Sequence, residues 1–186
     1  FRYDSSFNAA YRDRECRIGL DADNLGMRFH NGICEVPVSG LMDKPGRFRP
    51  AQLCAMSKEE MRDALAHAVE SEAIQFSAFS HSFELMSRDR AVVNRLAVAR
   101  LKALCRAVAD DPRVTSGGFE GLPLPPVQPG RIEAAAPRPV RTWKRVVEQG
   151  VGHLAHEVHY IRSLTYVAAN SSRWGKFVGS IILAMA

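Results

Sequence analysis

The chain has 186 residues, 46% of them hydrophobic and 24% charged, which suits one domain, or one domain with an appendage, that can bury a core. Its net charge of +5 lies wholly in the last third, because residues 1–122 carry 17 basic and 17 acidic side chains and residues 123–186 carry 8 and 3. No nucleic-acid recognition motif accompanies this modest excess, so we expect no nucleic-acid partner.

Cysteine spacing and apolar stretches limit the class of protein further. No CxxC pair occurs, which argues against a zinc ribbon or a thioredoxin site. We favour four free thiols in a reducing cytosol, with a structural disulfide as the alternative, for Cys16, Cys34, Cys54 and Cys105. No signal-peptide pattern is visible, and no apolar stretch reaches the roughly 18–20 residues that span a bilayer. These features predict a protein that is cytoplasmic or peripheral at the inner membrane.

The first two thirds of the chain alternate between strand and helix patterns. We expect strands over residues 1–7, 33–39 and 74–81, an irregular charged segment over 9–32, and a loop over 40–53. Ser57 and Glu60 form a capping-box pattern that predicts a helix to about residue 71, and a second helix is expected over 90–109. This order predicts an α/β fold with parallel strands and helical crossovers.

The last third has a different composition. Residues 123–141 form an expected linker, because six prolines fall within 17 residues of this stretch. Residues 142–186 form an expected helical tail, with apolar residues at helical spacing as far as residue 169. Basic side chains flank this apolar stripe, so the tail fits either an anionic membrane surface or a docked helix or protein partner. We expect the tail histidines to lie on the polar face rather than to bind a metal: His153, His156 and His159.

One histidine stands at a position where ligands gather in parallel sheets. His81 ends the buried strand expected over 74–81, and Asp4 lies near the end of the strand expected over 1–7. The carboxyl ends of such strands form the ligand-binding edge. A histidine at a strand end can equally be a packing residue, and Ser80, Ser82 and Glu84 can simply hydrogen-bond the turn that follows.

Four segments in order resemble a known family. "FRYDSSFN" (1–8), "EVPVS" (35–39), "FSHSFEL" (79–85) and "TSGGFEGL" (115–122) are together similar to the C-terminal half of a polysaccharide deacetylase domain of the NodB-homology type, a carbohydrate esterase family. The resemblance covers residues 1–122. It implies part of an irregular (β/α) barrel whose metal-dependent reaction removes acetyl groups from sugars in polysaccharides.

The resemblance also implies roles for individual residues. His81 matches the histidine that protonates the leaving group, and Asp4 lies near the acidic residue that orients that histidine. Phe79, where the family usually has leucine, is expected to form an apolar wall for the acetyl methyl group, and Ser80 to contact the substrate. The tryptophan usual beside the acidic residue is absent.

The metal-binding motifs of the family have no counterpart in this chain. The Asp-Asp pair and the His-x-x-x-His element of the family, which hold a divalent metal such as zinc, precede the segment that resembles residues 1–8. A three-ligand site cannot be assembled from the motifs that do match. We therefore expect no metal and no hydrolase activity in this chain alone, with activity in a longer parent. The alternative is a non-catalytic interaction protein or membrane-surface protein built on a deacetylase remnant.

Overall fold

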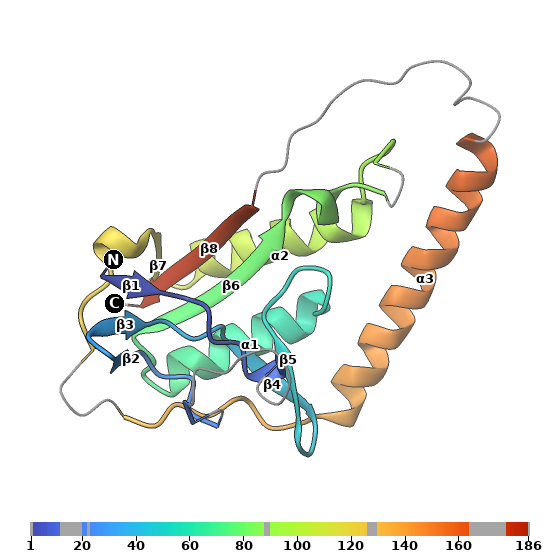
Figure 1. The fold of residues 1–186 in the computed structure, drawn as a ribbon. Coiled ribbons are helices and arrows are strands. Elements are labelled where there is room, and N and C mark those ends of the chain that lie inside the picture. Colours follow the sequence, from blue (N-terminus) through green and yellow to red (C-terminus); the bar gives the residue numbers. More distant parts are fainter. Residues whose placement is uncertain are drawn as a thin grey trace.

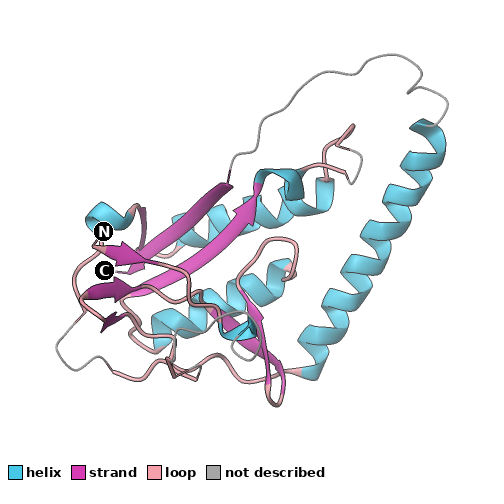
Figure 2. Ribbon diagram, in the orientation of Figure 1, coloured by secondary structure: helices cyan, strands magenta, loops and turns pink. Residues whose placement is uncertain are grey.

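The computed structural model describes residues 2–11, 20–21, 23–87, 90–125, 130–163 and 178–185, with side chains as far as residue 152. These residues form a mixed α/β fold with three small sheets (Figures 1 and 2). The first sheet has the order β1-β3-β2, the second is the hairpin β4-β5, and the third has the order β6-β8-β7. The strands are β1 (Tyr3–Asp4), β2 (Arg28–His30), β3 (Ile33–Glu35), β4 (Gly40–Lys44), β5 (Arg47–Pro50), β6 (Gln75–His81), β7 (Val114–Gly117) and β8 (Val178–Met185).

Backbone hydrogen bonds join residues 1–7, residues 33–39 and β6 in the middle of the molecule. β1 pairs with β3 in parallel, and the same pattern continues as Val38 N donates to Phe7 O. On the other side, Ser39 N donates to Ser77 O in β6, and Phe79 N donates to Ala51 O. Strands β1 and β3 are therefore parallel where they pair, whereas β3 and β6 belong to different sheets and the 33–39 segment meets β6 through the bond from Ser39 to Ser77.

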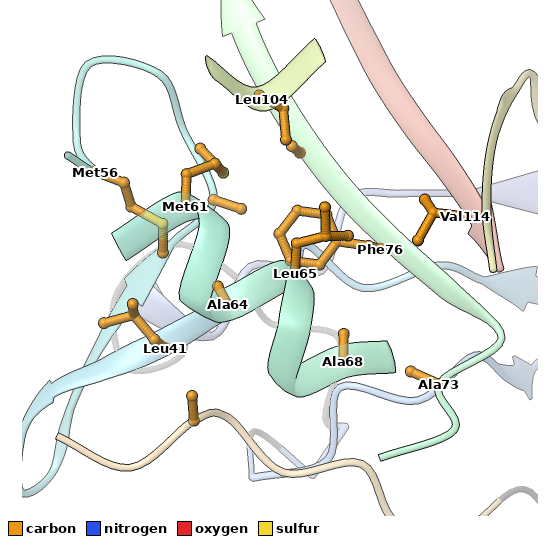
Figure 3. Close-up of a cluster of buried hydrophobic side chains, with 13 residues drawn as sticks. Leu41, Met56, Met61, Ala64, Leu65, Ala68, Ala73, Phe76, Leu104 and Val114 are labelled. Carbon is orange, nitrogen blue, oxygen red and sulfur yellow. The ribbon is translucent and has the colours of Figure 1, made fainter. Parts of the chain in front are cut away.

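Helix α1 (Lys58–Glu70) covers this layer and supplies much of the core. Its capping box forms as the sequence predicts, because Ser57 accepts from Glu60 N while the Glu60 side chain accepts from Ser57 N. Apolar side chains at helical spacing on α1 meet those of β4, β6, β7 and α2 (Arg95–Asp110) in the main core (Figure 3). The fully buried ring of Phe76 lies among Leu65, Leu104 and Val114 in that core.

The proline-rich segment is held against the body rather than left free. Leu25 N donates to Ile132 O at 2.7 Å, and Met42 N donates to Ala135 O at 2.8 Å. Ala135 is only 6% exposed and belongs to the main core. The segment then enters helix α3 (Pro139–Ser163), where proline occupies a first-turn position at which no helical N–H is lost.

Buried ion pairs fasten the first half of α3 to the body. Arg145 is 7% exposed and lies between Asp43 of β4, at 2.8 Å, and Glu60 of α1, at 3.0 Å. Burial opposes ionisation of Asp43, but the hydrogen bond and charge of Arg49, with the charge of Arg145, lower its pKa below the ordinary value. Arg141 adds a weaker contact to Asp63. None of the described helices is both long and apolar enough to cross a bilayer.

Several expectations need correction. The described residues close no barrel, so the (β/α) barrel is not borne out. The loop expected over 40–53 contains the hairpin β4-β5, whose Pro45-Gly46 turn places Gly46 at a φ of 72°. The irregular segment 9–32 contains β2, and the tail expected to be helical ends in strand β8. The second helix begins at Arg95 rather than at residue 90, because Asn94 is its N-cap.

Removing the central cation of the α3 attachment should cost stability. We expect Arg145→Ala to lower the free energy of unfolding by about 3 kcal/mol, because it leaves the fully buried carboxylate of Glu60 without the cation paired to it, whereas Asp43 keeps Arg49. Urea unfolding followed by circular dichroism measures the change. The control is Lys144→Ala, whose exposed pair with Glu59 should contribute less than about 1 kcal/mol. Equal losses in the two variants would contradict this account of how α3 is held.

Candidate functional site

A histidine–glutamate pair forms where β6 ends. His81 is the last residue of β6, and the 3-10 turn that follows (Ser82–Leu85) brings Glu84 back beneath the imidazole ring. His81 Nδ1 lies 2.9 Å from Glu84 Oε1. The His81 side chain is 31% exposed and that of Glu84 only 4%. A carboxylate can only accept, so Nδ1 carries the proton and Nε2 is the ring nitrogen left for chemistry.

Glu84 is held by donors from separate parts of the chain. Gln52 Nε2 donates to the same oxygen as His81, and Ser80 Oγ donates to Oε2 at 3.2 Å. The backbone of the turn is fixed as well, because Asn94 Nδ2 donates to Glu84 O at 3.2 Å. Since each carboxylate oxygen is engaged, Glu84 cannot turn away from His81 without leaving buried polar groups unpaired.

Cys54 touches the same carboxylate but is not an activated thiol. Burial raises the pKa of the Cys54 thiol to about 12, with the charge of Glu84 and a hydrogen bond to it acting in the same direction. The thiol therefore stays protonated near neutral pH and serves as a donor to Glu84. Cys34, Cys54 and Cys105 are free thiols, and Cys16 lies outside the described residues.

Two aromatic rings flank the imidazole. The ring of Phe83 stacks on His81 with centroids 4.9 Å apart and planes at 18°, and that of Phe79 meets it edge-on at 5.9 Å. Phe83 is 54% exposed, so one face of this aromatic group is open to solvent. The exposed histidine is thus bordered by apolar surface, which could receive a small apolar group of a ligand.

Asp4, the second expected catalytic residue, belongs to a different cluster. It lies beside Glu35 in the paired strands β1 and β3, and Ser6 Oγ donates to its carboxylate at 2.7 Å. Burial raises the pKa of Glu35 to about 7, opposed by a hydrogen bond from Phe7 N and reinforced by the charge and hydrogen bond of Asp4. In the place where Asp4 was expected, Glu84 orients His81.

The two residues expected to contact substrate, Phe79 and Ser80, both make contacts within the protein. Ser80, expected to contact substrate, donates to Glu84 instead, whereas Phe79 does lie against the imidazole as an apolar wall. Among the described residues, no three histidine, cysteine or acidic side chains lie close enough to hold a metal ion. His81 and Glu84 therefore do not fit a three-ligand metal site on their own. The side chains of His153, His156 and His159 fall outside the described ones.

From the sequence, Glu84 was expected only to hydrogen-bond the turn after the strand. No role at this site was expected for Gln52, Cys54 or Asn94. Gln52 and Cys54 lie in a segment expected to be an ordinary loop, and nothing in their local pattern marks them. The spacing of His81 and Glu84, three residues apart after a strand, is the one signal that could have indicated the pair. The chain matches no protein-family model, no curated protein and no solved structure.

The Asp4–Glu35 pair predicts a pH dependence of stability. In the unfolded chain Glu35 should ionise near its ordinary pKa of about 4.3, but in the folded protein only at about 7. The folded state then holds the extra proton between these values, so the free energy of unfolding should fall as pH rises from about 5 to 7 and level off above. Glu35→Gln should remove most of this fall, which is on the order of 3 kcal/mol.

Urea unfolding at a series of pH values measures this effect. The matched control is Glu120→Gln, because Glu120 is exposed and its substitution should leave the slope as it is in the unmodified chain. A slope unchanged in Glu35→Gln would contradict the assignment of this pH dependence to Glu35.

Proposed function

We propose that residues 1–122 supply the acid half of the active site of a metal-dependent polysaccharide deacetylase, with His81 as the residue that protonates the leaving group. The substrate class is an acetylated amino sugar or sugar ester in a bacterial surface polysaccharide or a related glycan. The observation that carries the proposal is the contact of 2.9 Å between His81 Nδ1 and the buried carboxylate of Glu84. Further support comes from the resemblance of four ordered segments to that family.

The pair suits the proton transfer that deacetylation needs. Cleavage of an acetamide would expel an amide anion unless a proton reaches the nitrogen as the bond breaks. With Nδ1 tied to Glu84, the imidazole presents Nε2 in a fixed direction, and the carboxylate stabilises the charged ring before it gives up its proton. Phe79 and the exposed Phe83 provide the apolar surface on which the acetyl methyl group or the sugar can lie.

The metal belongs to the part of the family domain that is not represented here. When bound, a divalent metal in such enzymes polarises the acetyl carbonyl and activates a water molecule. The described residues of this chain offer His81 and Glu84 for proton transfer and do not make up the metal site. This chain would thus supply the acid and the apolar wall, and the metal and the base would come from residues that precede the resembling segment in the family.

A non-catalytic interaction protein remains the second candidate, because one face of α3 is apolar and exposed. Val140, Trp143 and Val151 are 69%, 66% and 62% exposed on that face. Binding to an anionic membrane is favoured less by the described part of α3, since its buried arginines Arg141 and Arg145 are engaged with carboxylates of the body. The apolar face fits a protein partner better.

Loss of the proposed acid gives the sharpest test of the deacetylase. In a chain extended N-terminally by roughly one half-domain, His81→Ala should lower acetate release from N-acetylated oligosaccharides by about 10²- to 10⁴-fold. Bound metal, measured by atomic emission, should be unchanged, because His81 is not a proposed ligand.

The control is His30→Ala in β2, which should leave turnover unaffected because its ring contacts Asn31 rather than the site. Full activity in His81→Ala would mean that the histidine is a packing residue. An extended chain that binds no metal and releases no acetate would reject the deacetylase and leave the interaction protein.

A further inference from the structure

Arg100 of α2 is a buried cation that contacts two other parts of the chain. It is 4% exposed, and its Nε donates to Glu148 Oε1 of α3 at 2.8 Å. Its Nη1 donates to Leu53 O at 3.0 Å and to Cys54 O at 3.1 Å. Burying a guanidinium group costs free energy unless charged and polar partners compensate it. These contacts therefore hold both α3 and the segment of Leu53 and Cys54 against α2.

The two carbonyls belong to the turn that reaches the carboxylate of Glu84. Residues 52–56 form this turn, in which Met56 N donates to Gln52 O at 3.0 Å. The Gln52 side chain donates to Glu84 Oε1, and the Cys54 thiol hydrogen-bonds the same carboxylate. Arg100 thus holds the backbone of the turn, while two side chains of the turn hold Glu84.

The planar guanidinium group links its two contacts. Its N–H groups point in directions fixed by the plane of the group, so the contact of Nε with Glu148 sets the direction in which Nη1 meets the turn. A lysine ammonium is a compact point charge and cannot reproduce this fork. The position of α3 is in this way coupled to the position of the turn. The end of the turn has a separate anchor, because Arg49 Nη1 donates to Ala55 O at 3.2 Å.

We propose that Arg100 is a positioning residue of the His81 site and that Glu148 of α3 fixes its orientation. Arg100 acts through the turn rather than on the imidazole. The donors of the turn reach Glu84 only while the turn lies against α2, and Glu84 holds His81 Nδ1 at 2.9 Å. The inference rests on the site of the proposed function but not on its reaction, since any proton transfer at His81 needs the same orientation of the ring.

The Cys54 thiol reports where the turn lies. Burial raises the pKa of this thiol to about 12, with Glu84 acting in the same direction, whereas the charge of Arg100 lowers it. Loss of that charge alone would raise the pKa of Cys54 further and make the thiol less reactive. Release of the turn has the opposite effect, because a thiol freed from burial and from Glu84 returns toward its ordinary pKa of 9.0. The sign of the change therefore separates positioning from charge.

Arg100→Ala should make Cys54 react faster with an aromatic disulfide reagent near neutral pH. A fall of the thiol pKa from about 12 to 9.0 raises the thiolate fraction about a thousandfold, and the weaker nucleophilicity of that thiolate leaves a net increase of about 30-fold. Peptide mapping by mass spectrometry follows each cysteine separately. The exposed Cys105 should keep its rate, and Cys34, which is 0% exposed, should stay unreactive in a folded variant.

Three further variants locate the effect. Arg100→Lys keeps the charge but not the planar group, so it should also speed the reaction of Cys54. Glu148→Ala should do so to a smaller extent, because Nη1 keeps its two carbonyls. The matched control is Arg141→Ala, since Arg141 is similarly buried, at 5% exposure, but contacts Asp63 rather than the turn. This control should leave the Cys54 rate unchanged.

The ring of His81 gives the second readout. In Arg100→Ala, Glu84 loses the donors of the turn, so the ¹H–¹⁵N spectrum should change from a proton on Nδ1 alone to a mixture of the two neutral tautomers. A Cys54 rate that falls or stays constant while Cys34 remains unreactive would overturn the proposal. An unchanged His81 tautomer would overturn it as well.

Unfolding and failure of the site itself are visible separately. Reaction of Cys34 in Arg100→Ala would mean that this variant is unfolded, and Glu148→Ala then decides by the same two readouts. An unmodified chain without the Nδ1 proton on His81 would reject the proposed acid. An unchanged tautomer in a folded Arg100→Ala variant would reject only the role of Arg100.

Discussion

The buried carboxylate of Glu84 is the constraint on which the His81 site depends. Its two oxygens are shared among an imidazole, an amide, a hydroxyl and a thiol, contributed by His81, Gln52, Ser80 and Cys54. These donors come from the end of β6 and from the loop before α1, so the carboxylate joins the two segments at the strand end. Burial and the contact with Glu84 raise the pKa of the Cys54 thiol, and the contact with His81 fixes one nitrogen of its ring. The carboxylate of Glu84 therefore leaves Nε2 as the ring nitrogen of His81 that is available for chemistry.

Local signals in the sequence predicted those parts of the fold that local interactions determine. The capping box of Ser57 and Glu60 starts α1 because both hydrogen bonds lie within one turn. β6 was predicted because a run of small and apolar residues needs burial on both faces, and His81 was placed at its end because the run stops there. Parallel strands with helical crossovers were expected from the order strand, helix, strand, helix over residues 35–109, but β3 and β6 lie in different sheets.

The rest depends on contacts between distant residues, which no local pattern reveals. Asp4 was assigned to His81 by the family resemblance, but its strand pairs with β3, which places it beside Glu35. The basic residues of the tail fitted a membrane surface and a docked helix equally well, and the sequence could not show that Arg145 is buried between carboxylates some 85 to 102 residues earlier in the chain. β8 was not predicted, because a short uncharged run after a helical pattern forms a strand only where it can pair with the edges of other strands, here β6 and β7.

The tautomer of His81 tests the central claim most directly. A long-range ¹H–¹⁵N correlation spectrum of the ¹⁵N-labelled chain distinguishes the two ring nitrogens of neutral histidine, and His81→Gln assigns the signals. If Glu84 holds the ring as the structure indicates, neutral His81 carries its proton on Nδ1 and leaves Nε2 bare. Protonation at Nε2 instead would mean that Glu84 does not orient the imidazole, and the proposed acid would lose its structural basis.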